Sequence, residues 1–271
     1  MPPRAARLLV STAVAVALGL GVAGCNTVNG PGTTGSIGMS SMASAPRSEA
    51  DWRQSLDVWG KRYRENPGDA AAAIAYARAL RATEQYSQAV AVLEQATLRN
   101  PNSMPLLGAY GRALADTGQY AKALDALDKA HTPDNPDWRV LNAQGAVLDQ
   151  MGRHDAAQRH YEAALKIVPG EPSILSNLGL SYALTKRLKQ AEATLRQASQ
   201  NPNAGSKVRQ NLALVVGLEG RFDEAERIAR ADLPQAEADA NAAYLRQMLA
   251  QQKDWKKPGR QIRIPRPDAG T

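Results

Sequence analysis

The chain has 271 residues, of which 33 are lysine or arginine, 26 are aspartate or glutamate, three are histidine and one is cysteine. The single cysteine excludes an intramolecular disulfide, and the three scattered histidines do not form a zinc-binding pattern. The formal net charge is +7, but residues 253–271 alone carry six lysines and arginines against two aspartates. The excess of base therefore belongs to one end of the chain and does not indicate a nucleic-acid-binding domain.

The first 24 residues have the composition of a secretory signal peptide. Arg4 and Arg7 give a positive start, residues 8–20 are almost entirely apolar, and small residues at 21–24 lead to Cys25. The apolar run is shorter than the roughly 20 residues of a transmembrane helix, so we expect residues 1–24 to be removed on export.

The run Val22, Ala23, Gly24 and Cys25 resembles the lipobox of bacterial lipoproteins. This resemblance implies cleavage before Cys25 and a covalent lipid on its thiol. Asn26 in the next position implies retention at the outer membrane, with the rest of the chain facing the periplasm. The alternative is that Cys25 is an incidental residue near an ordinary cleavage site. Residues 25–49 are rich in glycine, serine and threonine, which predicts a flexible tether.

Helical periodicity begins after the tether. Residues 50–66 predict an incoming helix with Trp52, Leu56 and Trp59 as its buried stripe. Five consecutive units of 34 residues follow without insertion, at residues 70–103, 104–137, 138–171, 172–205 and 206–239, and a polar capping helix is predicted at 240–252. The array as a whole spans residues 50–253.

Two positions of each unit hold small residues in a constant register. They are Ala77, Gly111, Gly145, Gly179 and Ala213 in the eighth position, and Ala89, Ala123, Ala157, Ala191 and Ala225 in the twentieth. Small residues fixed to one period mark the places where paired helices approach too closely for a larger side chain.

This pattern resembles the tetratricopeptide repeat. The third unit carries nearly the whole motif of that family, in Gly145, Leu148, Gly152, Ala157, Tyr161, Ala164 and Pro169. The resemblance implies an all-α fold, a right-handed superhelical solenoid of antiparallel helix pairs with capping helices at both ends. The sequence departs from the pattern at Glu84, where glycine is usual, and at Ala229 and Asp232, where a large apolar residue and an alanine are expected.

In solenoids of this family the first helix of each unit lines the concave side. The corresponding residues are Arg78, Arg112, Arg139, Asn142, Asp149, Asn177, Leu180, Leu184, Lys207, Asn211, Leu214 and Leu218. We expect the groove to be charged in the first units, where Arg81 and Asp116 also lie, and to become apolar toward the last units. Asn177 and Asn211 would hydrogen-bond a bound peptide, and the leucines would accept its apolar side chains. Alternatively the leucines cover one another or pack on the capping helix. The basic residues do not match the set that other members use to clamp a terminal carboxylate.

Catalytic patterns are lacking in the sequence. No nucleophile elbow and no phosphate-binding loop can be assigned, because the glycines follow the repeat period. His154 replaces the aromatic residue of other units and is explained by packing. We predict no enzymatic activity, no metal, no cofactor, no small-molecule substrate and no nucleic-acid partner.

A lipidated repeat array of this size is similar to the lipoproteins of the TadD family, from the tight-adherence (Tad, or Flp) pilus machinery. This similarity implies a pilotin-like role in pilus assembly and secretion, with the secretin or another Tad component as partner. Two alternatives are a general envelope scaffold, for outer-membrane protein assembly or recruitment of peptidoglycan enzymes, and an inner-membrane assembly factor. The basic, proline-containing tail at 254–271 is expected to be either a solvated end or a segment that docks on a partner.

Overall fold

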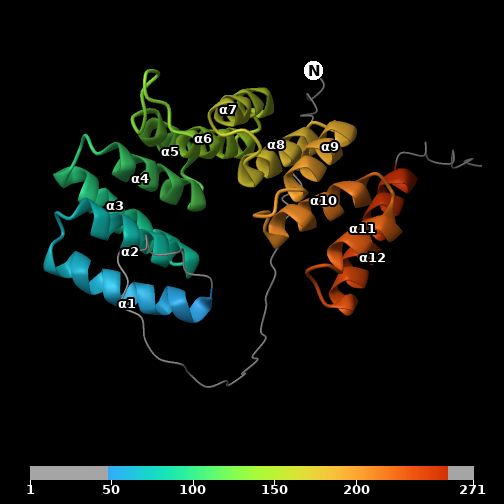
Figure 1. The fold of residues 1–271 in the computed structure, drawn as a ribbon, viewed down its shortest axis with the longest axis horizontal. Coiled ribbons are helices and arrows are strands. Elements are labelled where there is room, and N and C mark those ends of the chain that lie inside the picture. The colour runs from blue at the N-terminus through green and yellow to red at the C-terminus, as the bar shows by residue number, and fades with distance from the viewer. Residues whose placement is uncertain (1–47, 256–271) are drawn as a thin grey trace, which may run out of the picture. The chain divides into compact units, whose positions relative to one another are not determined.

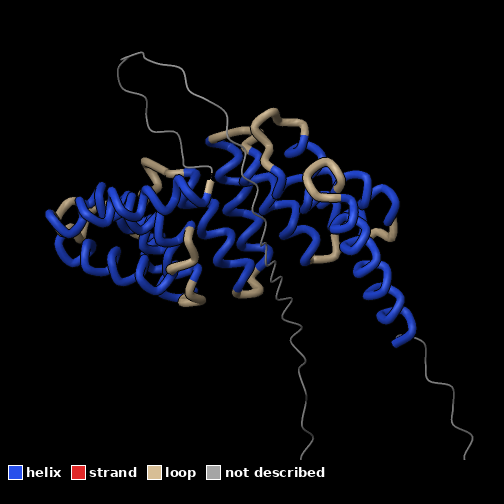
Figure 2. The backbone as a smooth tube through the Cα atoms, turned by 90° about the horizontal axis from the view of Figure 1, so that it is seen from below, coloured by secondary structure: helices blue, strands red, loops and turns tan. Residues whose placement is uncertain are grey.

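The computed structural model describes residues 48–255, with side chains up to residue 250. Within this range every regular element is a helix (Figure 2). The helices are α1 (Glu49–Glu65), α2 (Ala70–Ala82), α3 (Tyr86–Arg99), α4 (Met104–Asp116), α5 (Tyr120–Asp128), α6 (Trp138–Gln150), α7 (His154–Ile167), α8 (Pro172–Leu184), α9 (Leu188–Ser199), α10 (Ser206–Leu218), α11 (Phe222–Ala229) and α12 (Gln235–Trp255).

Several predictions fall outside this range. The signal peptide at 1–24, the lipid on Cys25, the tether up to residue 47 and the tail from residue 256 onward are not among the described residues. Of the helices that are described, none combines the length and apolar character needed to cross a bilayer.

The helices stack as hairpins in chain order. Each helix contacts the next one along the chain, and each first helix from α2 to α10 also contacts the first helix of the following unit, α12 taking that place at the end (Figure 1). The predicted all-helical repeat solenoid is therefore confirmed. Six clusters of buried apolar side chains run between the hairpins and hold neighbouring units together.

The turn inside each hairpin has the same geometry in all five units. The fifteenth residue adopts a left-handed φ, and these residues are Glu84, Gly118, Gly152, Lys186 and Gly220. The next amide donates to the carbonyl five residues earlier, as Arg153 N does to Leu148 O at 2.9 Å. This closing bond ends the first helix and starts the second two residues later.

The small residues lie where the helices of a pair meet. A Cβ placed on Gly145 would lie 2.5 Å from Cε1 of Tyr161, and one on Gly111 or Gly179 would lie 2.6 Å from Cγ of a leucine on the paired helix. The alanines of the predicted packing set are all buried: Ala77, Ala89, Ala123, Ala157, Ala191, Ala213 and Ala225.

The terminal helices begin earlier than predicted. α1 begins at Glu49, inside the predicted tether, because Ser48 and Asp51 form a reciprocal capping box. α12 begins at Gln235 rather than 240, and its first turn contributes Ala238, which is fully buried against Ala213 and Ala229. The predicted end of the fifth unit at 239 therefore lies within α12.

The second unit has a short second helix. α5 has 9 residues, against 14 in α3 and α7 and 8 in α11, and ends at Asp128. An irregular segment leads from there to Trp138, and α5 and α6 make the smallest contact of any two consecutive helices in residues 48–255.

Candidate protein-binding groove

The predicted groove residues all lie on the first helices α2, α4, α6, α8 and α10. Four of them are exposed, namely Arg78, Arg139, Leu184 and Lys207. The others are partly buried, namely Arg112, Asn142, Asp149, Asn177, Leu180, Asn211, Leu214 and Leu218. Whether these residues contact a partner stays a prediction, but their surroundings differ from one end to the other.

The apolar end of the groove is formed on α8 and α10. Leu184 is 58 % exposed, and Leu180, Leu214 and Leu218 keep part of their surface in solvent. None of the four belongs to the core clusters found among the described residues. Leucines that keep solvent-accessible surface on neighbouring helices form a surface suited to the apolar side chains of another polypeptide.

The asparagines of the groove link neighbouring first helices. Asn177 Nδ2 donates to Asn142 Oδ1 at 3.0 Å, and Asn211 Nδ2 donates to Ser176 Oγ at 2.9 Å. These bonds use part of the hydrogen-bonding capacity of each amide and fix its orientation, leaving the other positions of the side chain for a ligand.

Asp149 was expected in the groove, but its carboxylate turns into the seam between the third and fourth units. It accepts hydrogen bonds from Tyr161 Oη (3.0 Å) and Ser181 Oγ (2.8 Å), lies 2.8 Å from His154 Nδ1, and its side chain is only 8 % exposed. Burial, reinforced by the charge of Asp149, raises the pKa of Tyr161 far above its usual value, so the phenol stays a donor. Asp149 therefore joins the repeats and does not face a ligand.

The basic end of the groove encloses a small pocket. Its volume is about 260 Å³, and it is lined by Ile74, Ala77, Arg78, Arg81, Leu93, Ala109 and Arg112. Arg81 pairs with Asp116 of the next unit. Burial lowers the pKa of Arg112, repulsion by Arg81, Arg78 and Arg139 lowers it further, and Asp137 opposes the shift. We use the name "arginine pocket" for this site.

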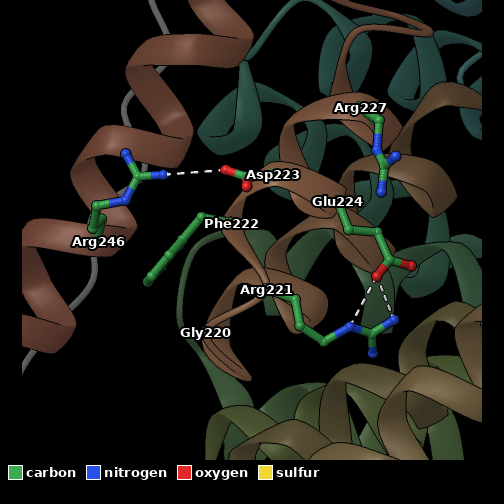
Figure 3. A pocket seen from close by; sticks show the side chains of 7 residues that line it. All are labelled: Gly220, Arg221, Phe222, Asp223, Glu224, Arg227 and Arg246. Atoms are coloured by element: carbon green, nitrogen blue, oxygen red, sulfur yellow. Dashed lines mark hydrogen bonds and ion pairs between the residues drawn. The ribbon is translucent and has the colours of Figure 1, made fainter.

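A second hollow lies at the other end of the array, between the start of α11 and α12 (Figure 3). Its volume is about 440 Å³. Two of its three arginines are paired with acids: Arg221 hydrogen-bonds Glu224, and Arg246 lies 3.6 Å from Asp223 and over the ring of Phe222 (Figure 3). The third, Arg227, forms no ion pair or side-chain hydrogen bond among the described residues.

Residues 48–250 contain no group of three or more histidine, cysteine, aspartate and glutamate side chains arranged to hold a metal ion. Two of the histidines lie within the helix packing. His154 contacts Asp149, as described above. His160 is partly buried, and this burial lowers its pKa.

Comparison with known proteins identifies the repeat. One family model, described as anaphase-promoting complex, cyclosome, subunit 3, matches residues 58–130, and another, described as tetratricopeptide repeat, matches residues 150–215. No curated protein sequence matches the chain.

Solved structures share the fold at low sequence identity. In the anaphase-promoting-complex hetero-tetramer Cut9-Hcn1, the match has a TM-score of 0.62 and 15 % identity, and covers 76 % of this chain and 42 % of that one. PilW, a widely conserved type IV pilus biogenesis factor, has a TM-score of 0.58 and 18 % identity, with 74 % and 91 % covered. PilF of Pseudomonas aeruginosa has a TM-score of 0.56 and 16 % identity, with 75 % and 90 % covered.

Tetratricopeptide-repeat folds bind protein partners, and the groove on the first helices stays the predicted surface for such binding in this chain. The 34-residue period and the stacked hairpins give the described residues the fold of a tetratricopeptide-repeat solenoid, and the tetratricopeptide-repeat model matches residues 150–215 within it.

Proposed function

We propose that this protein is an outer-membrane-anchored, periplasm-facing lipoprotein that binds a protein partner in its groove and acts as a pilotin-like factor in Tad/Flp pilus assembly. The partner proposed is the secretin subunit. The observation that carries the binding role is the group of four leucines on α8 and α10, one exposed and three partly buried, which lies outside the core clusters of the described residues.

Two further arguments support the pilus assignment. The sequence from Val22 to Cys25 resembles a lipobox, which would deliver the groove to the periplasmic side of the envelope. The fold is shared with PilW over 91 % of that protein's length, and PilW takes part in type IV pilus biogenesis. The lipid is the only covalent group that the proposal requires, and it would be held by Cys25.

The binding role is tested by Leu180→Asp combined with Leu214→Asp. A carboxylate at each position would disfavour burial of the partner's apolar side chains. We expect the double variant to lose co-precipitation of the secretin and its multimers, while far-ultraviolet circular dichroism keeps the helical signal. The matched control is Val58→Asp with Leu98→Asp, because these side chains are 55 % and 73 % exposed on α1 and α3, outside the first-helix positions.

Partner and anchor are tested separately. Secretin multimers that persist after deletion of the whole protein would reject the pilotin role and favour the envelope-scaffold alternative. Cys25→Ser should release the protein from the outer-membrane fraction, and a variant that remained there would contradict lipid anchoring.

A further inference from the structure

The two hollows of the array differ in whether acidic residues line them beside the arginines. In the hollow beside α12, acidic side chains line the walls together with the bases (Figure 3). The arginine pocket between α2, α3 and α4 has three arginines in its lining and no acidic residue. Arginines grouped at a surface without acids beside them give a surplus of positive charge, which a bound anion can neutralise.

Nearby acids remove only part of this surplus. Arg81 has Asp116, but Arg78 and Arg112 form no ion pair or hydrogen bond with any other side chain among residues 48–250. Arg112 is partly buried, and the charges that act on it most strongly belong to Arg81, Asp137 and Arg78. Its guanidinium is thus partly desolvated without a side-chain acceptor in hydrogen-bonding contact, an arrangement that costs stability in the free protein.

The guanidinium of Arg112 has a defined place. Nη1 lies 3.6 Å from the position that a Cβ on Gly108 would take, so the side chain lies back along its own helix over the glycine. The rest of the pocket lining is apolar: Ile74, Ala77, Leu93 and Ala109. A short methylene chain that ends in an anionic group would match this combination of apolar wall and charged rim.

We propose that the arginine pocket is a carboxylate-binding subsite of the groove, which takes the side chain of a glutamate from the partner. This inference rests on the proposed protein-binding function and specifies the chemistry of the partner. The planar guanidinium groups of Arg78 and Arg112 would each donate to carboxylate oxygens, and the glutamate methylenes would contact the apolar wall. A bound partner would then have one orientation in the groove. Its acidic segment would lie at α2 and α4, and its apolar segment would lie at α8 and α10.

A fluorescence-anisotropy titration of the full chain at low salt tests this subsite. The probe is a labelled dodecapeptide with a C-terminal amide, three glutamates in one half and leucines in the other, made in both orders. Its control has glutamine in place of glutamate. We expect one order of the glutamate peptide to bind at least about tenfold more tightly than the glutamine peptide. A glutamine peptide with a free C-terminal carboxylate distinguishes a terminal carboxylate from a side-chain carboxylate as the bound group.

Variants assign the effect to the pocket. Arg78→Gln with Arg112→Gln should abolish the preference for glutamate, whereas Arg64→Gln with Arg159→Gln, which removes two exposed arginines from α1 and α7, should keep it. The pocket variant should unfold at the same temperature as the native chain or higher, because it no longer carries a partly buried, unpaired charge. A second variant, Arg78→Lys with Arg112→Lys, keeps the positive charges but loses the paired hydrogen bonds that a guanidinium group donates to a carboxylate. It should bind the glutamate peptide with intermediate affinity.

Equal binding of the glutamate and glutamine peptides by the native chain, or a glutamate preference that survives in Arg78→Gln with Arg112→Gln, overturns the subsite. Failure of both peptides to bind also overturns it. Failure of the subsite is distinguishable from failure of the groove, because secretin co-precipitation and its loss in the leucine double variant do not depend on the peptide result.

Discussion

Arg209 and Asp232 form a two-point ion pair within the fifth unit. Arg209 Nε lies 2.7 Å from Asp232 Oδ2, Nη2 bonds the other carboxylate oxygen, and Nη1 donates to Ala204 O at 3.0 Å. Hydrogen bonding by Arg209 holds the pKa of Asp232 below its usual value. The other four units have a buried alanine in place of Asp232, and alanine or leucine in place of Arg209. Two departures from the repeat pattern therefore compensate each other.

Breaking this pair from either side should destabilise the C-terminal end of the array. Asp232→Ala leaves a partly buried arginine without its acceptor, and Arg209→Leu leaves a carboxylate without its donor. The double variant Arg209→Leu with Asp232→Ala restores the side chains of the other units and should recover most of the loss. Urea denaturation of all four proteins measures the coupling, and strictly additive effects would show that the pair is not a unit.

Gly145→Ser should weaken the third hairpin. The new Cβ would lie 2.5 Å from the Tyr161 ring, and that ring is tied to Asp149 through its hydroxyl, so it cannot move aside freely. Overpacking of this kind costs about 1–3 kcal/mol in the free energy of unfolding. Gly205→Ser is the matched control, because no atom lies within 4 Å of its added Cβ and serine is a good N-cap for α10. Equal stability of the two variants would contradict the close contact.

Lys186→Gly and Glu84→Gly should each stabilise the protein. Both residues adopt a left-handed φ, at 63° and 61°, where glycine carries no steric penalty. We expect a gain of about 1 kcal/mol at each site, since left-handed conformations cost other residues roughly that amount. Arg159→Gly, at an exposed position in the middle of α7, should lose a similar amount, and thermal unfolding compares the three variants. A loss of stability at residues 84 and 186 as well would disprove the turn geometry.

Glu192 should make stability depend on pH in the acid range. Burial raises its pKa, but hydrogen bonds from Arg196 and Arg221 outweigh burial and lower it to about 2. In the unfolded chain a glutamate has a pKa of about 4.3. The stability that the ionised group contributes is therefore complete above pH of about 4.3 and is lost as pH falls toward 2.

Thermal unfolding of the native chain and Glu192→Gln across this range checks the effect. The native protein should lose more stability between pH 5 and 2 than the variant, with a difference in proton uptake that approaches about one proton. Glu65→Gln serves as the control, because its carboxylate is exposed at the end of α1. If the unfolding temperature falls with pH in the same way in all three proteins, Glu192 does not contribute the expected pH-dependent stability.

The repeat pattern was sufficient to predict the fold because packing imposes the same requirement every 34 residues. Small residues recur at the positions of Gly145 and Ala157 because paired helices touch there in every unit. The first-helix positions of Arg78 and Leu180 follow from the same period. The lengths of the terminal helices could not be predicted as well, because they depend on single local interactions, such as the Ser48 cap.

The interactions between repeats could not be predicted in the same way. Asp149 occupies a groove position by period, yet its side chain bonds Ser181 of the next unit, 32 residues away. Asp232 is recognisable as a departure, but nothing in the linear pattern names Arg209 as its partner. Side-chain rotamers at the seams decide these contacts, and a period specifies positions rather than rotamers.

The seam between α5 and α6 has the smallest contact of any two consecutive helices in residues 48–255, so we expect it to deform more easily than the other seams. The arginine pocket lies before the seam between α5 and α6, and the groove leucines of α8 and α10 lie after it. A small rotation at this seam would alter the distance between the two binding regions while leaving each of them intact. Hydrogen exchange that is faster in α5 than in α7 would register such motion. One groove could then fit partners whose acidic and apolar segments are separated by different lengths of chain.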